Sequence, residues 1–385
     1  MNPFEFQTVP HIISKAGAAS VLGETIVLHY PAVRHVLLVT DAGFLKTGLM
    51  QTAIENIKAK QIEVSVFSDV VADPPESVVL SAVSQARRLH VDLVVGFGGG
   101  SSMDVAKLIA ILVSGDQELS SMYGIGNIRG QRLPLIQIPT TAGTGSEATP
   151  IAIVTTGETS KMGVVAPQLY ADIAILDAQL TLDLPAAVSA ATGIDAMVHA
   201  IEAYTTRHKK NPLSDMLATQ ALQLLWNNIR IVCRAPHNLA ARQSMLLGAL
   251  LAGQSFANAP CAAVHALAYP IGGIFHVPHG LSNSLVLPAV LRFNASIAHP
   301  QYAELAAIIA PQQNGSTEAK SAALIHALEQ LAEELGIATR LQQVGIKEED
   351  LDRLATDAML QTRLLGNNPR DVNWEQARQI YNDVL

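Results

Sequence analysis

The segment at residues 92–103 reads DLVVGFGGGSSM and indicates the fold of the first half of the chain. An apolar run at Asp92–Gly96 leads through glycines into a helical pattern that continues to Val113. In a strand–glycine–helix unit the glycines let the backbone approach an anion, and the free N–H groups at the helix start donate to that anion. A tight turn that needs positive φ is the alternative explanation. The segment predicts an α/β unit with a phosphate-binding loop.

The same alternation of short β-branched runs and helical patterns extends from about residue 35 to about residue 178. It is typical of parallel strands joined by crossover helices. Strands are expected at His35–Thr40, Glu63–Ser68, Asp92–Gly96, Leu135–Pro139 and Ile173–Asp177, helices at Leu45–Lys60, Glu76–Leu89 and Ser102–Val113, and a β-hairpin at Ile151–Thr155 with Lys161–Val165.

After about residue 183 the sequence becomes rich in Ala, Leu and Gln, which favours helices. Helix starts are expected at Asn211, which precedes Pro212, and at Asn373, which is followed three residues later by Gln376. We therefore predict two domains: an α/β nucleotide-binding domain at residues 1–183 and an all-helical metal-binding and catalytic domain at residues 184–385.

Composition narrows the class of protein. The 385 residues carry a net charge of −8, so the chain lacks the excess of Lys and Arg that favours nucleic-acid binding. No apolar run is long enough to span a membrane, and residues 1–23 lack the pattern of a signal peptide, so a cytoplasmic location is expected. Cys233 and Cys261 are too few for a disulfide framework and are expected as buried apolar side chains. A Gly-x-Ser-x-Gly elbow and a His-Glu-x-x-His motif are both absent, which argues against a hydrolase of those types.

Two further features fit a nucleotide site. Asp41 follows the predicted strand that ends at Thr40 and could accept hydrogen bonds from ribose hydroxyls while repelling a 2′-phosphate; a helix cap is the alternative. The loop at residues 139–147 reads PTTAGTGSE and could line a cofactor closely, although such residues are also common in turns.

Four residues in the second half suit a metal ion. Asp195 and His199 are four apart on a predicted helix and share one face. His265 and His279 are fourteen apart, and the Pro and Gly residues between them are expected to let the chain double back. Three imidazoles and one carboxylate suit iron, zinc, nickel or cobalt. The alternative interpretation is that these histidines are hydrogen-bonded residues of the core. His276 is an ambiguous fifth candidate.

Four motifs, in this order, resemble the iron-containing (group III) alcohol dehydrogenase family over nearly the whole chain. They are GGGSSMDVAK at residues 98–107, PTTAGTGSE at 139–147, GIDAMVHAIE at 193–202, and His265 with Pro278-His279-Gly280. The resemblance implies a dehydroquinate synthase-like fold, with an α/β nucleotide-binding domain and an all-helical metal domain. It also implies a metal-dependent, NAD-linked alcohol dehydrogenase that interconverts a small alcohol and its aldehyde or ketone.

The resemblance assigns residues position by position. The implied metal ligands are Asp195, His199, His265 and His279, with Fe²⁺ as the expected ion and Zn²⁺ as a competitor. The implied cofactor contacts are Asp41, Gly98, Gly99, Gly100, Ser101, Ser102, Asp104, Thr140, Thr141, Thr144 and Lys161. Asp41 favours NAD over NADP. A homodimer or a larger homo-oligomer is expected, because such assemblies are common in the family.

Two positions depart from the family pattern. Tyr269 stands where many members have a second histidine, and since a phenol has an ordinary pKa near 10 we assign it no acid–base role. Asp73-Pro74 replaces an Asn-Pro, which puts a cofactor contact there in doubt. Phe256 and Tyr269 are expected to border a pocket for a small, weakly charged alcohol.

Other functions remain open at this point. One is a related oxidoreductase of the glycerol dehydrogenase, maleylacetate reductase or hydroxyacid-oxoacid transhydrogenase type. Another is a dehydroquinate-synthase-like lyase, although the site segments are poor in the Lys and Arg that an acidic carbocycle requires. A non-enzymatic nucleotide- or metal-binding protein is the third.

Overall fold

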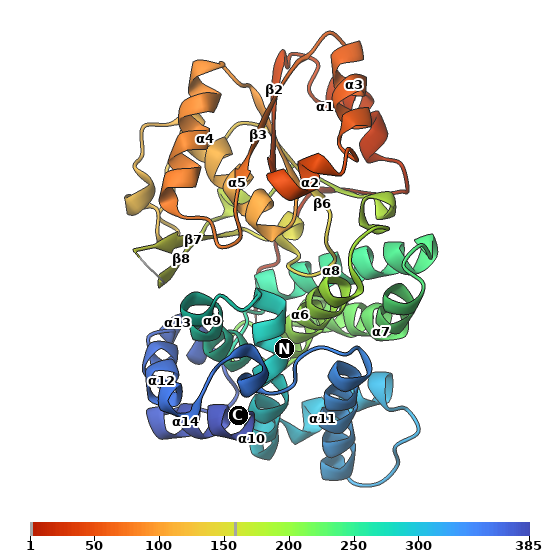
Figure 1. Cartoon of the computed structure of the whole chain (residues 1–385), viewed down its shortest axis with the longest axis vertical. Helices are drawn as coiled ribbons and strands as arrows, with labels where there is room; N and C mark the ends of the chain where they lie inside the picture. The colour runs from red at the N-terminus through yellow and green to blue at the C-terminus, as the bar shows by residue number, and fades with distance from the viewer. Residues whose placement is uncertain (1–2, 158–159) are drawn as a thin grey trace. The chain divides into compact units, whose positions relative to one another are not determined.

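The computed structural model describes residues 3–157 and 160–385. The chain divides into two compact units: residues 7–183, and residues 184–385 together with the described residues before Gln7. Figure 1 shows strands and helices in the first unit and helices throughout the second. None of the helices in the described part of the chain combines the length and apolar character that crossing a bilayer requires.

The first unit is built on a six-stranded sheet in the order β1-β9-β6-β4-β2-β3, in which all neighbouring strands are parallel. Its strands are β1 (His11–Ser14), β2 (His35–Asp41), β3 (Glu63–Val70), β4 (Leu93–Gly98), β6 (Leu135–Pro139) and β9 (Ile173–Leu176). Its helices are α1 (Leu22–His29), α2 (Ala42–Lys46), α3 (Gln51–Ala59), α4 (Glu76–Arg88) and α5 (Gly100–Ser114). The five predicted strands and the predicted α/β class are confirmed.

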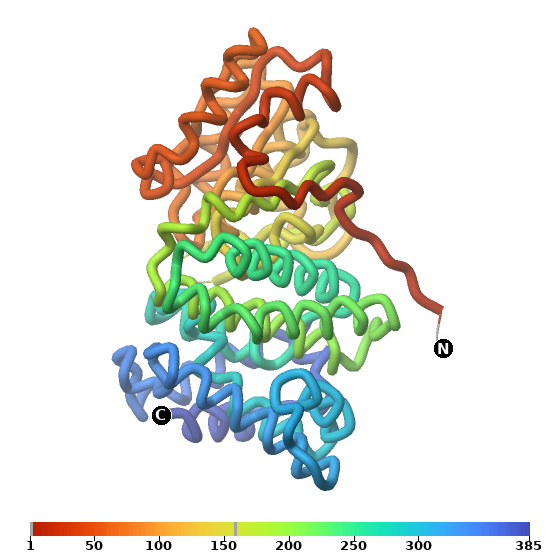
Figure 2. The backbone as a smooth tube through the Cα atoms, turned by 90° about the vertical axis from the view of Figure 1, so that its right-hand side faces the viewer, coloured from red at the N-terminus to blue at the C-terminus, as the bar shows by residue number. Residues whose placement is uncertain are grey.

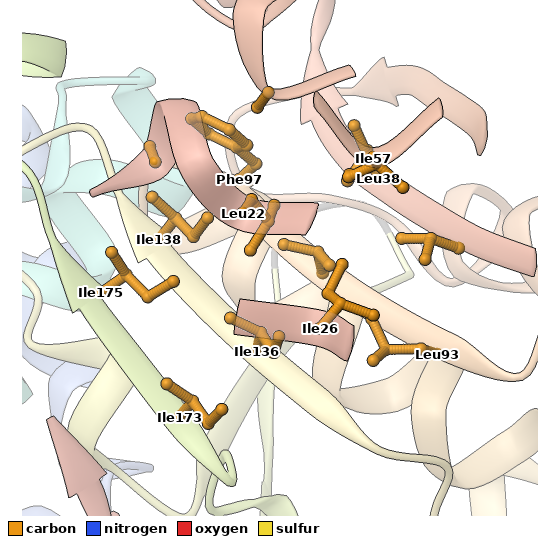
Figure 3. Packing of buried hydrophobic residues seen from close by; sticks show 14 of the residues in the cluster. Leu22, Ile26, Leu38, Ile57, Leu93, Phe97, Ile136, Ile138, Ile173 and Ile175 are labelled. Atoms are coloured by element: carbon orange, nitrogen blue, oxygen red, sulfur yellow. The ribbon is translucent and has the colours of Figure 1, made fainter. Parts of the chain in front are cut away.

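Both faces of the central strands are covered, which explains their unbroken apolar sequences. Leu38 of β2 and Phe97 of β4 lie on one face, in a buried cluster with Leu22 of α1 and Ile57 of α3 (Figure 3). Because side chains alternate along a strand, Gly96 of β4 points to the opposite face.

Helix α5 packs on this opposite face, against β2, β4 and β6. A Cβ on Gly96 would stand 2.0 Å from Oε1 of Gln137 and 3.0 Å from Cβ of Ala106. The Gln137 amide also donates to the carbonyl of Met103 in the first turns of α5, at 3.0 Å. Glycine at position 96 therefore allows the helix to lie close to the strand that leads into it.

The predicted hairpin is confirmed. Strands β7 (Ile151–Thr156) and β8 (Ser160–Val165) are antiparallel with Thr155 opposite Lys161, and the short strand β5 (Gly124–Ile125) joins β8. Residues 158–159 of its turn lie outside the described residues.

The second unit is helical, as predicted, and its long helices α7 and α8 pack along one another (Figure 2). Its helices are α6 (Ala186–Thr205), α7 (Pro212–Arg234), α8 (Leu239–Asn258), α9 (Ala263–Phe275), α10 (His279–Ile309), α11 (Thr317–Glu334), α12 (Leu351–Met359), α13 (Thr362–Leu365) and α14 (Trp374–Asp383). Both predicted helix starts are confirmed, because Asn211 accepts from the backbone N–H of Ser214 and Asn373 accepts from that of Gln376.

Two predicted helices have different bounds in the first unit. The helix expected at Leu45–Lys60 is split into α2 and α3, since Gly48 adopts a φ of 76° that ends the first of them. Helix α5 begins at Gly100, two residues before its expected start, so the glycine loop supplies its first turn. Strand β1 and helix α1 were not predicted.

Two expectations for the second half are also wrong. The chain does not double back at the glycines between His265 and His279: Pro270 and Gly272 lie inside α9, and the direction changes at residues 276–278. Cys233 is only partly buried, whereas Cys261 is buried as expected.

A buried polar network ties α5 to the loop that follows β6. The Lys107 ammonium, fully buried, donates to Oγ of Ser146 at 2.7 Å and to the carbonyl of Ile151 at 2.6 Å. Ser146 donates in turn to Oδ1 of Asp104 at 2.6 Å. Glu147 lies beside this network with 2% of its surface exposed, and burial raises its pKa to about 7 although Lys107 opposes the shift.

We expect Glu147→Gln to change how stability depends on pH. An ordinary carboxyl titrates near 4.5, so between about pH 4.5 and 7 the folded protein binds a proton at Glu147 that the unfolded chain releases. The free energy of unfolding of the wild type therefore falls relative to the variant as pH rises through this window, by up to about 3 kcal/mol. Urea unfolding between about pH 4.5 and 7 measures the free energy of unfolding, and Glu349→Gln, at an exposed position, controls for the lost charge. Parallel curves for wild type and Glu147→Gln would contradict the expectation.

Candidate functional site

The four side chains predicted as metal ligands come together in the second unit. Asp195 and His199 lie on α6, His265 on α9 and His279 at the first position of α10. One potential ligand atom from each lies within 4.8 Å of the others. The close approach of α10 to α6 depends on Gly280, where a Cβ would stand 2.4 Å from the carbonyl oxygen of Ala191.

The spacing of these atoms suits one divalent ion. Nε2 of His265 lies 3.0 Å from Nε2 of His199 and 3.9 Å from Oδ1 of Asp195, while Nε2 of His279 lies 3.6 Å from the same oxygen. Ligand atoms about 2.1 Å from a tetrahedral ion stand about 3.4 Å apart, within this range. Three imidazoles and one carboxylate are also a donor set that such ions take. The residues present therefore fit a divalent transition metal.

The electrostatics of the cluster favour an ionised carboxylate. Asp195 is 1% exposed, and burial alone would raise its pKa. The three neighbouring imidazoles and the amide of Asn283 outweigh burial and hold this pKa below its ordinary value. The cluster therefore presents a buried negative charge surrounded by nitrogen donors.

Two residues that the sequence analysis did not assign contact the cluster. Nδ2 of Asn283 donates to Oδ1 of Asp195 at 2.6 Å and lies 3.3 Å from Nε2 of both His265 and His279. Glu202 lies 2.6 Å from Nδ1 of His265. Helical spacing was the available signal, since Asn283 is four residues after His279 and Glu202 is three after His199.

Aromatic side chains border the cluster. The ring of Phe256 stacks on His199 with centroids 4.3 Å apart, and Tyr269 is tilted against His279 with centroids 5.9 Å apart. The His279 side chain is 30% exposed, compared with 4% for His265, so the cluster is most accessible beside His279 and Tyr269. His276 does not join these residues, because it is exposed at the end of α9.

A second group of potential ligands shares His265: Glu202, Cys261 and His265 are all buried, with their ligand atoms within 4.8 Å of one another. Burial raises the pKa of Cys261 and favours the neutral thiol, whereas a metal requires the thiolate. The first cluster is therefore the better candidate for a metal.

The glycine loop of the first unit lies at a topological switch point of the sheet. Strand β2 pairs with β3 on one side and with β4 on the other, and β4 continues the sheet toward β6. Ligands of open α/β sheets bind where the strand order reverses, beyond the carboxyl ends of the strands. Asp41 at the end of β2 and Gly98 at the end of β4 lie at this point.

The geometry of the glycines favours ligand approach over a tight turn. None of Gly98, Gly99 and Gly100 has positive φ. A Cβ on Gly100 would stand 2.7 Å from Cγ2 of Thr144, so this glycine serves packing. A Cβ on Gly99 would meet Oγ1 and Cγ2 of Thr141 at 3.7 and 3.9 Å, which are ordinary contact distances, so packing within the first unit does not require glycine here. The approach of an anion to the backbone at the start of α5 is the remaining reason for a glycine at this position.

The other predicted cofactor contacts differ in the exposure and hydrogen bonding of their side chains. Ser101, Thr141 and Thr144 are partly exposed in the loops at the carboxyl ends of β4 and β6, where Thr140 and Ser102 are buried. Asp41 caps α2 by accepting from the backbone N–H of Phe44 at 2.8 Å.

Asp104 and Lys161 have internal partners. The carboxylate of Asp104 accepts from Ser146 and, through its second oxygen, from the backbone N–H of Ile153 at 2.9 Å. The Lys161 ammonium pairs with Asp73 at 2.6 Å. These contacts hold the loop after β6 and the β7–β8 hairpin in place.

Comparison with known proteins gives the same family in both halves of the chain. A family model described as iron-containing alcohol dehydrogenase matches residues 10–178, and one described as the C-terminal part of the Fe-containing alcohol dehydrogenase family matches residues 189–385.

Individual proteins resemble the chain over almost its whole length. Long-chain-alcohol dehydrogenase 1 of Geobacillus thermodenitrificans is 38% identical over 352 residues, which cover 90% of this chain and 89% of that protein. The crystal structure of a 1,3-propanediol oxidoreductase superposes with a TM-score of 0.95 at 33% identity and covers 100% of both chains. A sulfoacetaldehyde reductase from Bifidobacterium kashiwanohense, solved in complex with NAD⁺, superposes with a TM-score of 0.87 at 28% identity, covering 100% of this chain and 99% of that one. The chain belongs to the iron-containing alcohol dehydrogenase family.

Proposed function

We propose that this enzyme is a metal-dependent, NAD-linked alcohol dehydrogenase that interconverts a small alcohol and its aldehyde or ketone. The observation that carries the proposal is the convergence of three imidazoles and one buried carboxylate from α6, α9 and α10. We further propose that residues 1–183 act as the nucleotide domain and residues 184–385 as the metal domain.

In the metal domain, Asp195, His199, His265 and His279 would hold the ion, and ferrous iron is the proposed occupant with zinc as its competitor. When bound, the metal supplies Lewis acidity toward the oxygen of the alcohol or carbonyl, and NAD supplies the hydride acceptor. Phe256 restrains the ring of His199 by stacking. The partly exposed side of His279, next to Tyr269, is the proposed position of the substrate.

In the nucleotide domain, the backbone at Gly99 and the N–H groups at the start of α5 would hold the pyrophosphate, with Ser101, Thr141 and Thr144 beside it. Asp41 would accept from the ribose hydroxyls with the carboxylate oxygen that does not cap α2. We propose that Asp104 and Lys161 act mainly through their internal pairs, which hold the loops around this site.

The relatives are named for different substrates, a long-chain alcohol, a propanediol and a sulfoacetaldehyde, so the family alone does not select among them. The neutral, aromatic border of the cluster supports an uncharged alcohol. A cytoplasmic location is proposed because both cysteines are free thiols, as expected in a reducing compartment. A homo-oligomer is proposed only because such assemblies are common in the family.

We expect NADH formation on a panel of primary alcohols and diols. The protein would be stripped of metal and refilled anaerobically with ferrous iron or zinc, and absorbance of the reduced cofactor would be followed. Activity should return with metal in the wild type but not in Asp195→Asn, because the amide removes the charge that three imidazoles surround. NAD binding without turnover under every condition would contradict the proposal and favour the lyase-like or binding-protein alternatives.

Gly99→Ala should weaken NAD binding without unfolding the protein. Gly99 has ordinary backbone angles, and the added methyl meets no atom nearer than 3.7 Å, so stability should change by no more than about 0.5 kcal/mol. Loss of one hydrogen bond to a charged phosphate, about 1.5–3 kcal/mol, corresponds to at least a tenfold rise in Kd. Calorimetric titration with NAD measures the Kd, and Gly115→Ala at the other end of α5 is the control. Equal affinities for both variants would exclude this loop as the pyrophosphate site.

Asp41→Asn should shift cofactor preference toward NADP. Asparagine retains the oxygen that caps α2 but removes the charge that repels a 2′-phosphate. The ratio of kcat/KM for NADP to that for NAD should rise at least about tenfold, the effect of about 1.4 kcal/mol. Asp92→Asn removes one charge at the amino end of β4 and serves as control. An unchanged ratio would show that Asp41 acts only as a helix cap.

A further inference from the structure

We propose that Glu202 is a positioning residue that fixes His265 in the one tautomer able to bind a metal ion. The inference rests on the proposed function, since it concerns the same metal centre. Glu202 does not belong to the four proposed ligands, and its carboxylate lies behind His265, on the ring nitrogen that does not face Asp195.

Both oxygens of Glu202 are engaged by α9. Oε1 accepts from the backbone N–H of Val264 at 2.7 Å, and Oε2 lies 2.6 Å from Nδ1 of His265. Glu202 is 3% exposed and His265 is 3% exposed, so water does not compete for these bonds. One carboxylate from α6 therefore holds both the backbone of Val264 and the ring of His265, at consecutive positions of α9.

The hydrogen bond from the Val264 N–H to Glu202 also caps the start of α9. The first N–H groups of a helix have no partner within the helix, and the residue before α9, Ala262, provides no side-chain cap. A carboxylate at a helix start is further favoured by the helix dipole. Glu202 thus acts as a cap supplied from another helix, which fixes the orientation of its second oxygen.

That orientation determines where the proton of His265 lies. One oxygen of Glu202 accepts from the Val264 N–H, and the other lies against Nδ1 of His265, so this contact places a ring proton on Nδ1. In the neutral ring Nε2 is then unprotonated, and it faces Nε2 of His199 at 3.0 Å and Oδ1 of Asp195 at 3.9 Å. An unprotonated imidazole nitrogen is the form that ligates a metal, and a carboxylate on the other nitrogen also increases its basicity.

Glutamine at position 202 cannot reproduce both bonds. The two donors, Val264 N–H and His265 Nδ1–H, reach two separate oxygens of Glu202, whereas an amide has only one oxygen. If the amide oxygen stays with Val264, its NH₂ group faces His265 and favours the opposite tautomer, with the proton on Nε2. The alternative orientation leaves the Val264 N–H without an acceptor in a buried site.

The test compares Co²⁺ affinity of wild type, Glu202→Gln and Glu304→Gln, measured by competition with a chelator and by the Co²⁺ absorption spectrum. Glu304 is exposed and accepts from the Tyr204 hydroxyl at 2.5 Å, so its variant controls for the lost charge. We expect Glu202→Gln to bind Co²⁺ about 10–100-fold more weakly than either of the others. Equal affinities and spectra would overturn the inference.

A second measurement does not depend on whether Glu202→Gln folds. Nitrogen-15 spectra of histidine-labelled, metal-free wild type report which ring nitrogen of His265 is protonated, with His265→Gln identifying the signal. At a pH at which the ring is neutral, a proton on Nδ1 supports the inference, and a proton on Nε2 overturns it. If the wild type binds no Co²⁺ at all, the proposed function fails as well; tight Co²⁺ binding together with the wrong tautomer contradicts the inference alone.

Discussion

The buried carboxylate of Asp195 is the constraint on which the arrangement of the second unit depends. A charged group removed from water requires compensating partners, and an isolated one costs far more than a domain can tolerate. Here three imidazoles and the Asn283 amide provide that compensation, and they come from α6, α9 and α10. The close contact of α10 with α6 at Gly280 brings His279 near Asp195. A divalent ion among these atoms would complete the compensation, which links the packing of the helices to the chemistry of the family.

In the first unit, the proposed nucleotide site depends on the approach of an anion to the backbone. The parallel sheet brings the carboxyl ends of β2, β4 and β6 to one edge, and the strand order reverses between β2 and β4, where open α/β sheets bind their ligands. Gly96 lets α5 lie close to the sheet, whereas packing does not require glycine at position 99, just before the helix start. The Lys107 network then holds the neighbouring loop against α5. Helix packing therefore accounts for Gly96, and the proposed pyrophosphate site accounts for Gly99.

Much of this arrangement could be predicted from the sequence, because the deciding signals are local. Apolar runs gave the five predicted strands, and Asn211 and Asn373 marked helix starts through their own side chains. The split at Gly48 was not predictable, since a helical pattern does not reveal a single residue with positive φ. Pro270 was expected to break the chain, but α9 accommodates it within a buried helix.

The site shows the same division between local and distant information. Asp195 and His199 could be paired by their spacing on one helix, whereas the approach of His265 and His279 to that pair depends on the packing of three helices. Glu202 and Asn283 were not assigned for the same reason: their partners lie 63 and 88 residues away in the chain. Asp41 and Lys161 could be singled out by resemblance, but only the structure reveals that one caps α2 and the other pairs with Asp73.

The central claim is that one divalent ion binds among Asp195, His199, His265 and His279. Anomalous diffraction at the iron edge, from crystals of the full chain loaded anaerobically with ferrous iron, tests it most directly. The account predicts a single strong peak within bonding distance of all four side chains. A peak elsewhere, or an ion held by Glu202 and Cys261 in place of Asp195 and His279, would contradict it.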